Sequence, residues 1–377
     1  MNNKKIILAG NTAWGMFNFR GKLIQKLVTS GFNVVVLAPY DNIYTQKLID
    51  LSVKFINISI NPKGTNPIQD ILLFLNYFKI FKCENPDFIF FYTIKPNIFG
   101  SLAAQKNKIP HIAITTGLGY VFLINNFASK ISRQLYKAAF KKINQVWFLN
   151  NDDKQTFIKN KLVDEKKTFV LKGEGIDLER FNILSIQKNN PVVFLLIARM
   201  LWDKGIGEFV EAARIIKKKY PETKFQLLGF LGVGNPSAIH KDQIDEWESE
   251  GIVDYLGVTE DVKSFIDNAT CITLPSYREG IPFTLLEASA SGKPIITTNS
   301  IGCKETVEDG VTGFLCDVKD TVGLASCMEK VIFLSPEEYS NMALAGRAKM
   351  GREFDVNLII KQYLKVLENY LIYSVLN

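Results

Sequence analysis

The spacing of apolar residues divides the chain into alternating strand-like and helix-like segments. Short apolar runs, which predict buried strands, lie in the first half at 6–9, 32–38, 54–60, 88–93, 111–115, 146–149 and 168–171. Apolar spacings of three and four residues, which predict helices, lie at 17–29, 68–81, 153–159 and 205–219. Further strand-like runs follow at 192–198, 225–228, 254–256, 269–274, 294–297 and 313–315. This alternation predicts an α/β protein built from doubly wound parallel sheets.

The length of the chain indicates that these segments form two domains. With 377 residues the chain is too long for one ordinary core. We therefore expect Rossmann-like domains at 1–185 and 186–354 and a terminal helix within 355–377. Ligands of such sheets bind at the carboxyl ends of the strands, so we expect the two domains to face a central cleft that holds the chemistry.

Composition narrows the class of protein. The chain is 47% hydrophobic and 22% charged, as ordinary folded proteins are. Its longest apolar runs, 88–94 and 192–198, are shorter than the roughly 18–20 residues of a membrane-spanning helix. The N-terminal residues are expected to form a first strand and not a leader peptide. Five cysteines without CxxC spacing favour reduced thiols in a cytoplasmic protein over zinc or disulfides.

Positive charge is concentrated in the first half of the chain. Residues 1–180 contain 25 Lys and Arg against 12 Asp and Glu, a net charge of +13, whereas the remainder has a net charge of −6. Such asymmetry is typical of a domain with an anionic partner, either lipid headgroups or nucleic acid, and equally of a solvated basic face. Because no nucleic-acid-reading motif or regular aromatic interleaving accompanies the charge, we expect no nucleic-acid partner.

The segment from Leu274 to Gly292, LPSYREGIPFTLLEASASG, predicts a strand, a tight turn and a helix. Pro282 suits the first helical turn, and Gly292 suits the residue after the helix. Backbone N–H groups at the start of such a helix favour an anion. Glu279 and Glu287 flank that position and can accept hydrogen bonds from hydroxyl groups on either side of the anion. A nucleotide sugar has that layout.

Two cations accompany this segment. Arg199 and Lys204 follow the strand at 192–198, at the sheet edge where the Glu279 loop is also expected. Fixed cations beside a helix N-terminus suit a diphosphate and offset the charge that develops as it departs. Val258 follows a glycine that allows a planar base to approach the backbone, although a simple turn explains the same glycine.

These residues together resemble the retaining glycosyltransferases of family 4, which have the two-domain GT-B fold. The features that match in the second domain are Arg199, Lys204-Gly205, Glu279-Gly280, Glu287, Gly292-Lys293-Pro294, Gly302 and Glu305. Those similar to the capsule and O-antigen branch of the family are Asn18-Phe19-Arg20, Thr116-Gly117-Leu118-Gly119-Tyr120, Gly175-Ile176-Asp177 and Phe181. The resemblance also implies that the C-terminal helix packs back on the first domain.

The resemblance assigns roles by position. It implies that Glu279 binds donor-sugar hydroxyls and acts in catalysis together with Arg199 and Lys204, which hold the diphosphate. The further donor-binding residues that it implies are Gly10, Asn11, Val258, Gly280, Ile281, Pro282 and Glu287, of which the last binds the ribose. The acceptor or sugar contacts that it implies are Asn18, Arg20, Thr116 and Gly117.

The reaction also follows from the resemblance. The acceptor attacks the face that the nucleotide leaves, and the departing phosphate helps to take the acceptor's proton, so neither a protein nucleophile nor a metal or cofactor is expected. The chain has two histidines, His111 and His240, and no Asp-x-Asp motif. Many family members have a histidine where this chain has Thr115 or Thr116. His111 lies earlier in that strand and is expected to be structural.

The same branch implies the substrates and the location. The expected donor is a UDP-sugar of GalNAc, GlcNAc or Gal, and the expected acceptor is a polyprenyl-diphosphate-linked saccharide in surface polysaccharide or glycan assembly. We expect a cytoplasmic enzyme, peripheral on the inner face of the plasma membrane. A stripe of basic residues over 127–145 suits either an anionic membrane or a surface helix that packs inward. Because it lies in the basic first half of the chain, we expect the N-terminal domain to contact an anionic membrane surface. A UDP-sugar epimerase of the same fold is the alternative.

Overall fold

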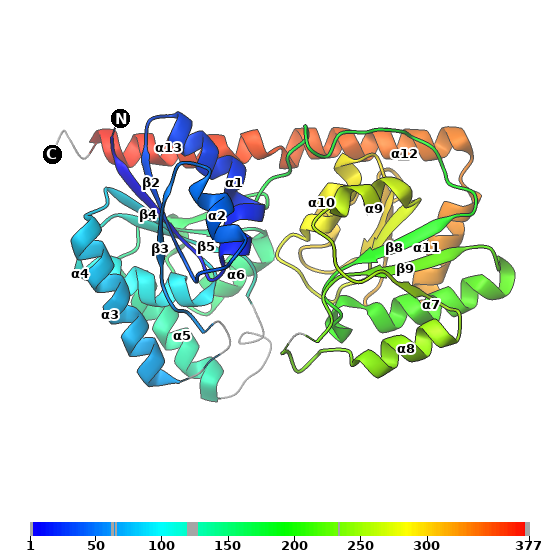
Figure 1. Ribbon diagram of the computed structural model, residues 1–377, viewed down its shortest axis with the longest axis horizontal. Helices are drawn as coiled ribbons and strands as arrows, with labels where there is room; N and C mark the ends of the chain where they lie inside the picture. The colour runs from blue at the N-terminus through cyan, green and yellow to red at the C-terminus, as the bar shows by residue number, and fades with distance from the viewer. Residues whose placement is uncertain (1–2, 62–63, 65, 119–126, 233, 374–377) are drawn as a thin grey trace. The chain divides into compact units, whose positions relative to one another are not determined.

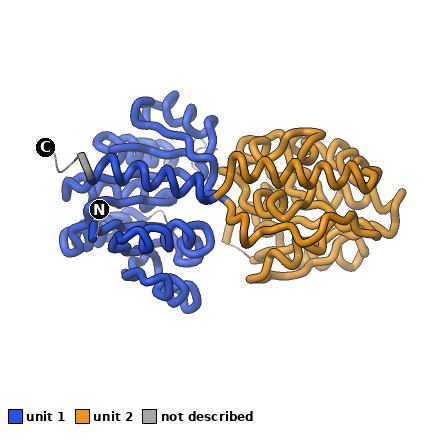
Figure 2. The backbone as a smooth tube through the Cα atoms, turned by 90° about the horizontal axis from the view of Figure 1, so that it is seen from above, with its two compact units in different colours: residues 1–175, 356–377 blue, residues 176–355 orange. Residues whose placement is uncertain are grey.

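The computed structural model describes residues 3–61, 64, 66–118, 127–232 and 234–373 (Figure 1). The chain forms two compact units (Figure 2). Unit 1 comprises Met1–Gly175 and Val356–Asn377, and unit 2 comprises Ile176–Asp355. Each unit has one sheet of parallel strands with helices packed on it, as the alternation of apolar segments predicts.

Seven parallel strands form the sheet of unit 1, in the order β3-β2-β1-β4-β5-β6-β7. They are β1 (Lys5–Ala9), β2 (Asn33–Ala38), β3 (Lys54–Asn57), β4 (Phe88–Tyr92), β5 (His111–Thr115), β6 (Gln145–Phe148) and β7 (Thr168–Val170). Because β1 pairs with both β2 and β4, the order of the strands reverses at the β1–β4 pair. Ligands of open α/β sheets bind at such a switch point, beyond the carboxyl ends of the strands.

Helices cover this sheet. They are α1 (Ala13–Thr29), α2 (Tyr44–Ile49), α3 (Pro67–Glu84), α4 (Ser101–Lys106), α5 (Phe127–Phe140), α6 (Asn151–Lys159) and α13 (Val356–Tyr373). A π-helical turn, Pro96–Gly100, leads directly into α4. The inward sides of α3, α4, α5 and α6 form one core with alternate residues of the strands.

The C-terminal helix α13 belongs to unit 1, as the resemblance implies. Its Tyr363 ring packs edge-on against Phe90 and Trp147, with ring centroids 4.9 Å apart in both cases. The hydroxyl group of Tyr363 lies 3.3 Å from that of Tyr92. The helix therefore covers the sheet face opposite to the core that α3 to α6 form.

Six parallel strands form the sheet of unit 2, in the order β10-β9-β8-β11-β12-β13. They are β8 (Val193–Ile197), β9 (Lys224–Leu228), β10 (Asp254–Tyr255), β11 (Cys271–Leu274), β12 (Ile295–Thr298) and β13 (Gly313–Cys316). The helices are α7 (Ile206–Lys219), α8 (Lys241–Ser249), α9 (Val262–Asn268), α10 (Phe283–Ala290), α11 (Thr321–Phe333) and α12 (Pro336–Lys349). The strand order reverses at the β8–β11 pair, which is the switch point of this unit.

The predicted strands match the observed ones closely, and the helix predicted over 205–219 corresponds to α7. Its inward side is fully buried and carries Phe209, Ala212, Ala213 and Ile216. Several shorter helices, such as α2, α8 and α9, have no counterpart among the predicted segments because their apolar repeats are short. In the part of the chain that the structure describes, no helix is both long and apolar enough to cross a membrane.

Candidate functional site

An ion pair lies at the switch point of unit 2. Lys204 ends a 3₁₀ turn, Trp202–Lys204, that follows β8, and Glu279 lies in the loop after β11. The Nζ atom of Lys204 donates a hydrogen bond to Oε1 of Glu279. The two side chains are 13% and 16% exposed, so the pair is mostly buried but open to a ligand. Since an ammonium group has three N–H donors, Lys204 can keep this bond and still bind a phosphate oxygen.

Two glycines make the close approach of these loops possible. Gly205 has φ +73°, and a Cβ atom there would lie 2.1 Å from the carbonyl oxygen of Pro275. Gly302 has φ +85°, and a Cβ atom there would lie 2.3 Å from the carbonyl oxygen of Glu279. The backbone N–H of Glu279 also donates to Ile301 at 2.9 Å. Only glycine therefore fits at positions 205 and 302, where the backbone passes close to the loops that hold the ion pair.

Side chains and backbone also join the two loops. The carbonyl oxygen of Asp203 accepts hydrogen bonds from the Tyr277 N–H at 3.0 Å and from the Ser276 hydroxyl at 3.2 Å. The Tyr277 hydroxyl donates to Oε1 of Glu208, in the first turn of α7, at 2.6 Å. Burial, and then the hydrogen bond to Glu208, raise the pKa of Tyr277. Tyr277 thus remains a donor at physiological pH and ties the Glu279 loop to α7.

The helix after this loop begins as an anion site requires. Pro282 is the N-cap of α10 and does not lie in its first turn, which corrects the predicted position by one residue. Pro282 offers no side-chain cap, and within the described residues the N–H groups of Ile281 and Thr284 make no hydrogen bond. At the other end, Gly292 has φ +74°, as expected after a helix. Gly280 lies in the turn that precedes the N-cap.

Glu287 lies on α10 and is only 8% exposed. Burial raises the pKa of its carboxyl group to about 8, and the positive charge of Arg180 opposes that shift. Among the described residues no hydrogen bond or ion pair involves this carboxyl group. A buried polar group of this kind is costly without a partner, and a ligand hydroxyl group would supply one.

Other predicted donor-site residues line the same edge of the sheet. Arg199 lies two residues after β8, is exposed, and has no ion pair within the described part of the chain. Val258 follows β10 and Phe230 follows β9, and both side chains are exposed. Sequence reasoning missed Phe230. Its position two residues after a predicted strand, at the end of the sheet where ligands bind, is the signal that could have found it.

The switch point of unit 1 has less charge. Gly10 follows β1 and donates its N–H to Leu37 at 2.9 Å, and a Cβ atom there would lie 2.5 Å from Sδ of Met16. Asn11 follows it and is half-buried. Thr116 and Gly117 follow β5, one strand further along the sheet. The Gly119 and Tyr120 positions of the predicted motif lie outside the described residues.

Arg20 is placed differently from the other predicted acceptor residues. It is buried, pairs with Glu174 through Nη2, and donates through Nη1 to the carbonyl oxygen of Gly15 at 3.0 Å. Its guanidinium also lies 4.0 Å from the ring centre of Tyr92. These bonds give Arg20 a structural role. Asn18 lies on the same helix, where its side chain donates to the carbonyl oxygen of Trp14 at 3.0 Å.

Two further sequence expectations concern the core of unit 1. His111 is buried in β5, and its Nδ1 atom lies 2.9 Å from the carbonyl oxygen of Ile109. Burial lowers the pKa of His111 to about 4, so it is neutral and structural. On α5, Ala139 and Phe140 belong to the core, whereas Lys137 is exposed. The C-terminal part of the apolar side of α5 therefore packs inward, whereas Ile131, nearer its start, is 45% exposed. Contact of α5 with a membrane stays a prediction.

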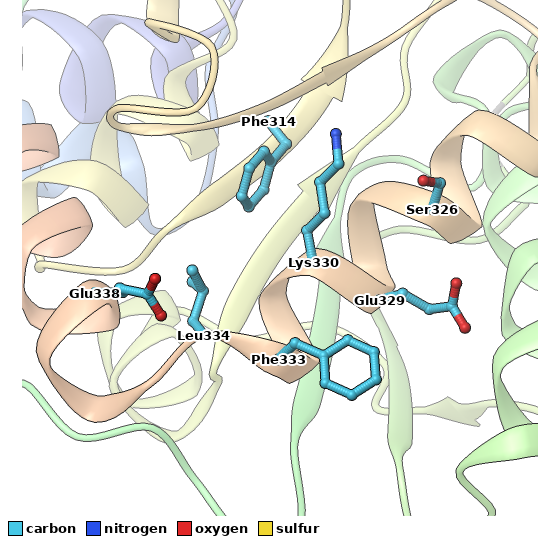
Figure 3. A pocket seen from close by; sticks show the side chains of 7 residues that line it. All are labelled: Phe314, Ser326, Glu329, Lys330, Phe333, Leu334 and Glu338. Carbon is cyan, nitrogen blue, oxygen red and sulfur yellow. The ribbon is translucent and has the colours of Figure 1, made fainter.

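A separate hollow of about 450 Å³ lies in unit 2, over the end of α11 (Figure 3). Its lining includes Phe314, Lys330, Phe333 and Leu334. The Lys330 ammonium lies 5.4 Å from the ring centre of Phe314. None of the predicted site residues lines this hollow.

Comparison with known proteins agrees with this architecture. The family profile described as "Glycosyl transferases group 1" matches residues 179–349, and the profile "Glycosyl transferase 4-like" matches residues 5–150. In the solved structures, a glycosyltransferase from Rickettsia africae has a TM-score of 0.79 at 21% identity, covering 98% of this chain and 99% of its own. Anabaena HepE in complex with UDP and glucose has a TM-score of 0.78 at 18% identity, covering 96% and 99%.

Curated enzymes, including the following two, are also similar in sequence. The N,N'-diacetylbacillosaminyl-diphospho-undecaprenol alpha-1,3-N-acetylgalactosaminyltransferase of Campylobacter jejuni is 33% identical over 371 residues, which cover 94% of this chain and 95% of that enzyme. The UDP-Gal:alpha-D-GlcNAc-diphosphoundecaprenol alpha-1,3-galactosyltransferase of Escherichia coli is 26% identical, covering 75% and 76%. Matches over both units, together with the fold, establish that the chain belongs to the group 1 glycosyltransferases, the retaining family 4 enzymes of the GT-B fold.

Proposed function

We propose that this glycosyltransferase moves a hexose or N-acetylhexosamine, that is GalNAc, GlcNAc or Gal, from a UDP-sugar to a polyprenyl-diphosphate-linked saccharide. The observation that carries the proposal is the Lys204–Glu279 pair at the switch point of unit 2. A cation and a carboxylate side by side suit a ligand that has a diphosphate next to sugar hydroxyls. The names of the two curated relatives support the lipid-linked acceptor.

Each residue at this edge has a role in the proposal. Lys204 and Arg199 hold the diphosphate, and the turn Gly280-Ile281-Pro282 lies beside it at the start of α10. Glu279 accepts hydrogen bonds from the donor sugar, and Glu287 from the ribose. Cations that face the departing diphosphate stabilise the charge that develops on it.

Further contacts complete the proposal. Val258 contacts the uracil, and Gly10 and Asn11 contact the donor sugar. Asn18, Thr116 and Gly117 contact the acceptor. Arg20 acts there indirectly, because its guanidinium is already bonded inside unit 1.

In the proposed step the bond between C1 of the sugar and the diphosphate oxygen breaks, and a bond between C1 and the acceptor hydroxyl oxygen forms. The acceptor's proton passes to the departing UDP. The enzyme works in the cytoplasm on the inner face of the plasma membrane, where a lipid-linked acceptor is held.

A screen of UDP-sugars against short-chain polyprenyl-diphosphate-linked saccharides, followed by mass spectrometry, tests this function. We expect the acceptor to gain the mass of one hexose or N-acetylhexosamine as UDP is released. Incubation with donor alone distinguishes the epimerase alternative. Conversion of the free UDP-sugar to its epimer, without transfer to any acceptor, would contradict the proposal.

A further inference from the structure

Helix α3 of unit 1 has large apolar side chains on two sides. Leu73, Tyr77 and Phe81 point into the core and are buried. On the outer side, four side chains with the helical spacing i, i+3, i+4 and i+7 are exposed by 68%, 60%, 53% and 41%: Ile68, Ile71, Leu72 and Leu75. We call these four residues the α3 stripe. In the described part of the chain, no other helix exposes more than two large apolar side chains.

The α3 stripe lies near the carboxyl edge of the sheet. Asp70, in the first turn of α3, forms an ion pair of 2.6 Å with Lys95, which closely follows the end of β4. The first turns of α3 are therefore held beside the loops that follow the strands, at the edge where the switch point lies. A surface here is close to the residues proposed to contact the acceptor.

Positive charge surrounds the α3 stripe. Lys79 and Lys82 continue its side of the helix and are exposed. Helix α5 contacts α4, as α3 does (Figure 1). It exposes Lys130 and Lys137, and Lys141, directly after it, is exposed as well. Residues 67–142 contain ten Lys and Arg against three Asp and Glu. Each of the three acidic residues, Asp70, Glu84 and Asp87, is paired with a lysine.

The exposed apolar stripe and the positive charge around it together indicate which kind of partner binds here. A second copy of the chain would bring an equally basic surface, and the two copies would repel each other. An anionic bilayer offers both headgroups for the lysines and an apolar layer for the α3 stripe, as for helices that lie in the membrane interface. We propose that the α3 stripe docks on an anionic lipid bilayer and holds the carboxyl edge of unit 1 at the membrane.

The proposal deepens the proposed function, because a lipid-linked acceptor stays in that bilayer. It is tested by flotation of the full chain with vesicles of phosphatidylglycerol and phosphatidylethanolamine, and with vesicles of phosphatidylcholine alone. We expect binding to the anionic vesicles only, weakened by added salt. The variant Ile71→Ser with Leu72→Ser should bind about tenfold more weakly, since both side chains lose apolar area that the bilayer would bury.

The matched control is Val322→Ser with Phe333→Ser, which removes two exposed apolar side chains of α11 in unit 2. It should float as the wild type does. Equal flotation of the α3 variant and the wild type would overturn the proposal. So would a wild-type dimer in light scattering that the α3 variant converts to a monomer, because the stripe would then be a self-association surface.

Transfer to a short-chain, water-soluble acceptor separates this proposal from the proposed function. The α3 variant should keep the wild-type rate on that acceptor and lose rate on the full-length acceptor in vesicles. If no protein transfers sugar to any acceptor while the flotation differences persist, the proposed function fails and the docking surface stands.

Discussion

In unit 2 the loops at the switch point bring a lysine and a glutamate together beside an uncapped helix, whereas in unit 1 the corresponding loops present Gly10, Asn11 and a lysine, Lys95, that pairs with Asp70 of α3. Unit 1 does have a buried ion pair, Arg20–Glu174, but it lies inside the fold. The two units thus use paired charges for different purposes. In unit 1 each of these pairs joins two segments of the fold, whereas in unit 2 the pair lies between two loops beside an uncapped helix start, which favours a charged ligand.

The largest expected effect concerns the buried pair of unit 1. Arg20→Ala leaves the Glu174 carboxylate buried without its cation and should lower the free energy of unfolding by about 3–5 kcal/mol. Chemical denaturation measures this change. Adding Glu174→Gln should recover part of the loss, because no buried charge then remains. Wild-type stability with selective loss of acceptor binding would instead make Arg20 a direct acceptor contact.

The matching change in unit 2 should affect activity and not folding. Lys204→Ala and Glu279→Ala should each lower the rate of transfer by about 100- to 1,000-fold, the range found when a group that stabilises developing charge is removed. Thermal unfolding should change less than in Arg20→Ala, since the Lys204–Glu279 pair is more open to water than Arg20–Glu174. Lys241→Ala, which removes an exposed lysine of the same unit, is the control. Near-wild-type transfer by both variants would contradict the proposed roles of Lys204 and Glu279.

The close fit of the backbone between the two loops should affect the reaction less than the charges of Lys204 and Glu279 do. Gly302→Ala puts a Cβ atom 2.3 Å from the carbonyl oxygen of Glu279, so the Glu279 loop must shift. We expect the donor KM to rise by about tenfold. Gly310→Ala is a matched control, since Gly310 has φ +72° but nothing within 4 Å of the added atom. Equal effects of the two variants would assign the result to backbone strain alone.

The Tyr277–Glu208 hydrogen bond should act through position. Tyr277→Phe removes the hydroxyl group that ties the Glu279 loop to α7, and we expect the donor KM to rise by about three- to tenfold while kcat changes less. Glu208→Gln keeps an acceptor for this hydroxyl group and should remain close to the wild type. Steady-state kinetics over a range of donor concentrations separates the two parameters. An unchanged KM in Tyr277→Phe would refute the positioning role.

The smallest effect is a dependence of stability on pH. Because burial raises the pKa of Glu287 to about 8 from an ordinary 4.5, the folded protein holds a proton that the unfolded chain releases between these values. Stability should therefore fall as the pH rises toward 8. Glu287→Gln stays neutral, so its Tm should fall less between pH 6 and pH 9. Parallel Tm curves for the two proteins would show that Glu287 is already ionised.

The sequence predicts much of unit 2 because local patterns determine it. Gly292 ends a helix by its own backbone conformation, and Glu279 and Lys204 follow strands that are recognisable as apolar runs. The Tyr277–Glu208 bond could not be predicted, because it joins segments from two strands that become neighbours only in the folded sheet.

In unit 1, what could not be predicted from the sequence has a different cause. A conspicuous arginine near the N-terminus suggests a ligand contact, and only the distant Glu174 shows that its charge is neutralised inside the fold. The apolar residues of α3 predict a buried helix. A helix that is apolar on two sides gives the same pattern whether its outer side is covered or exposed, so the pattern alone cannot reveal the α3 stripe.

We propose that the nucleotide binds at the switch point of unit 2. Amide hydrogen exchange with and without saturating UDP tests it most directly. We predict slower exchange in the loops at 199–205, 257–258 and 277–284, with little change at 10–12 and 93–97 in unit 1. Protection confined to the loops of unit 1 would contradict the account.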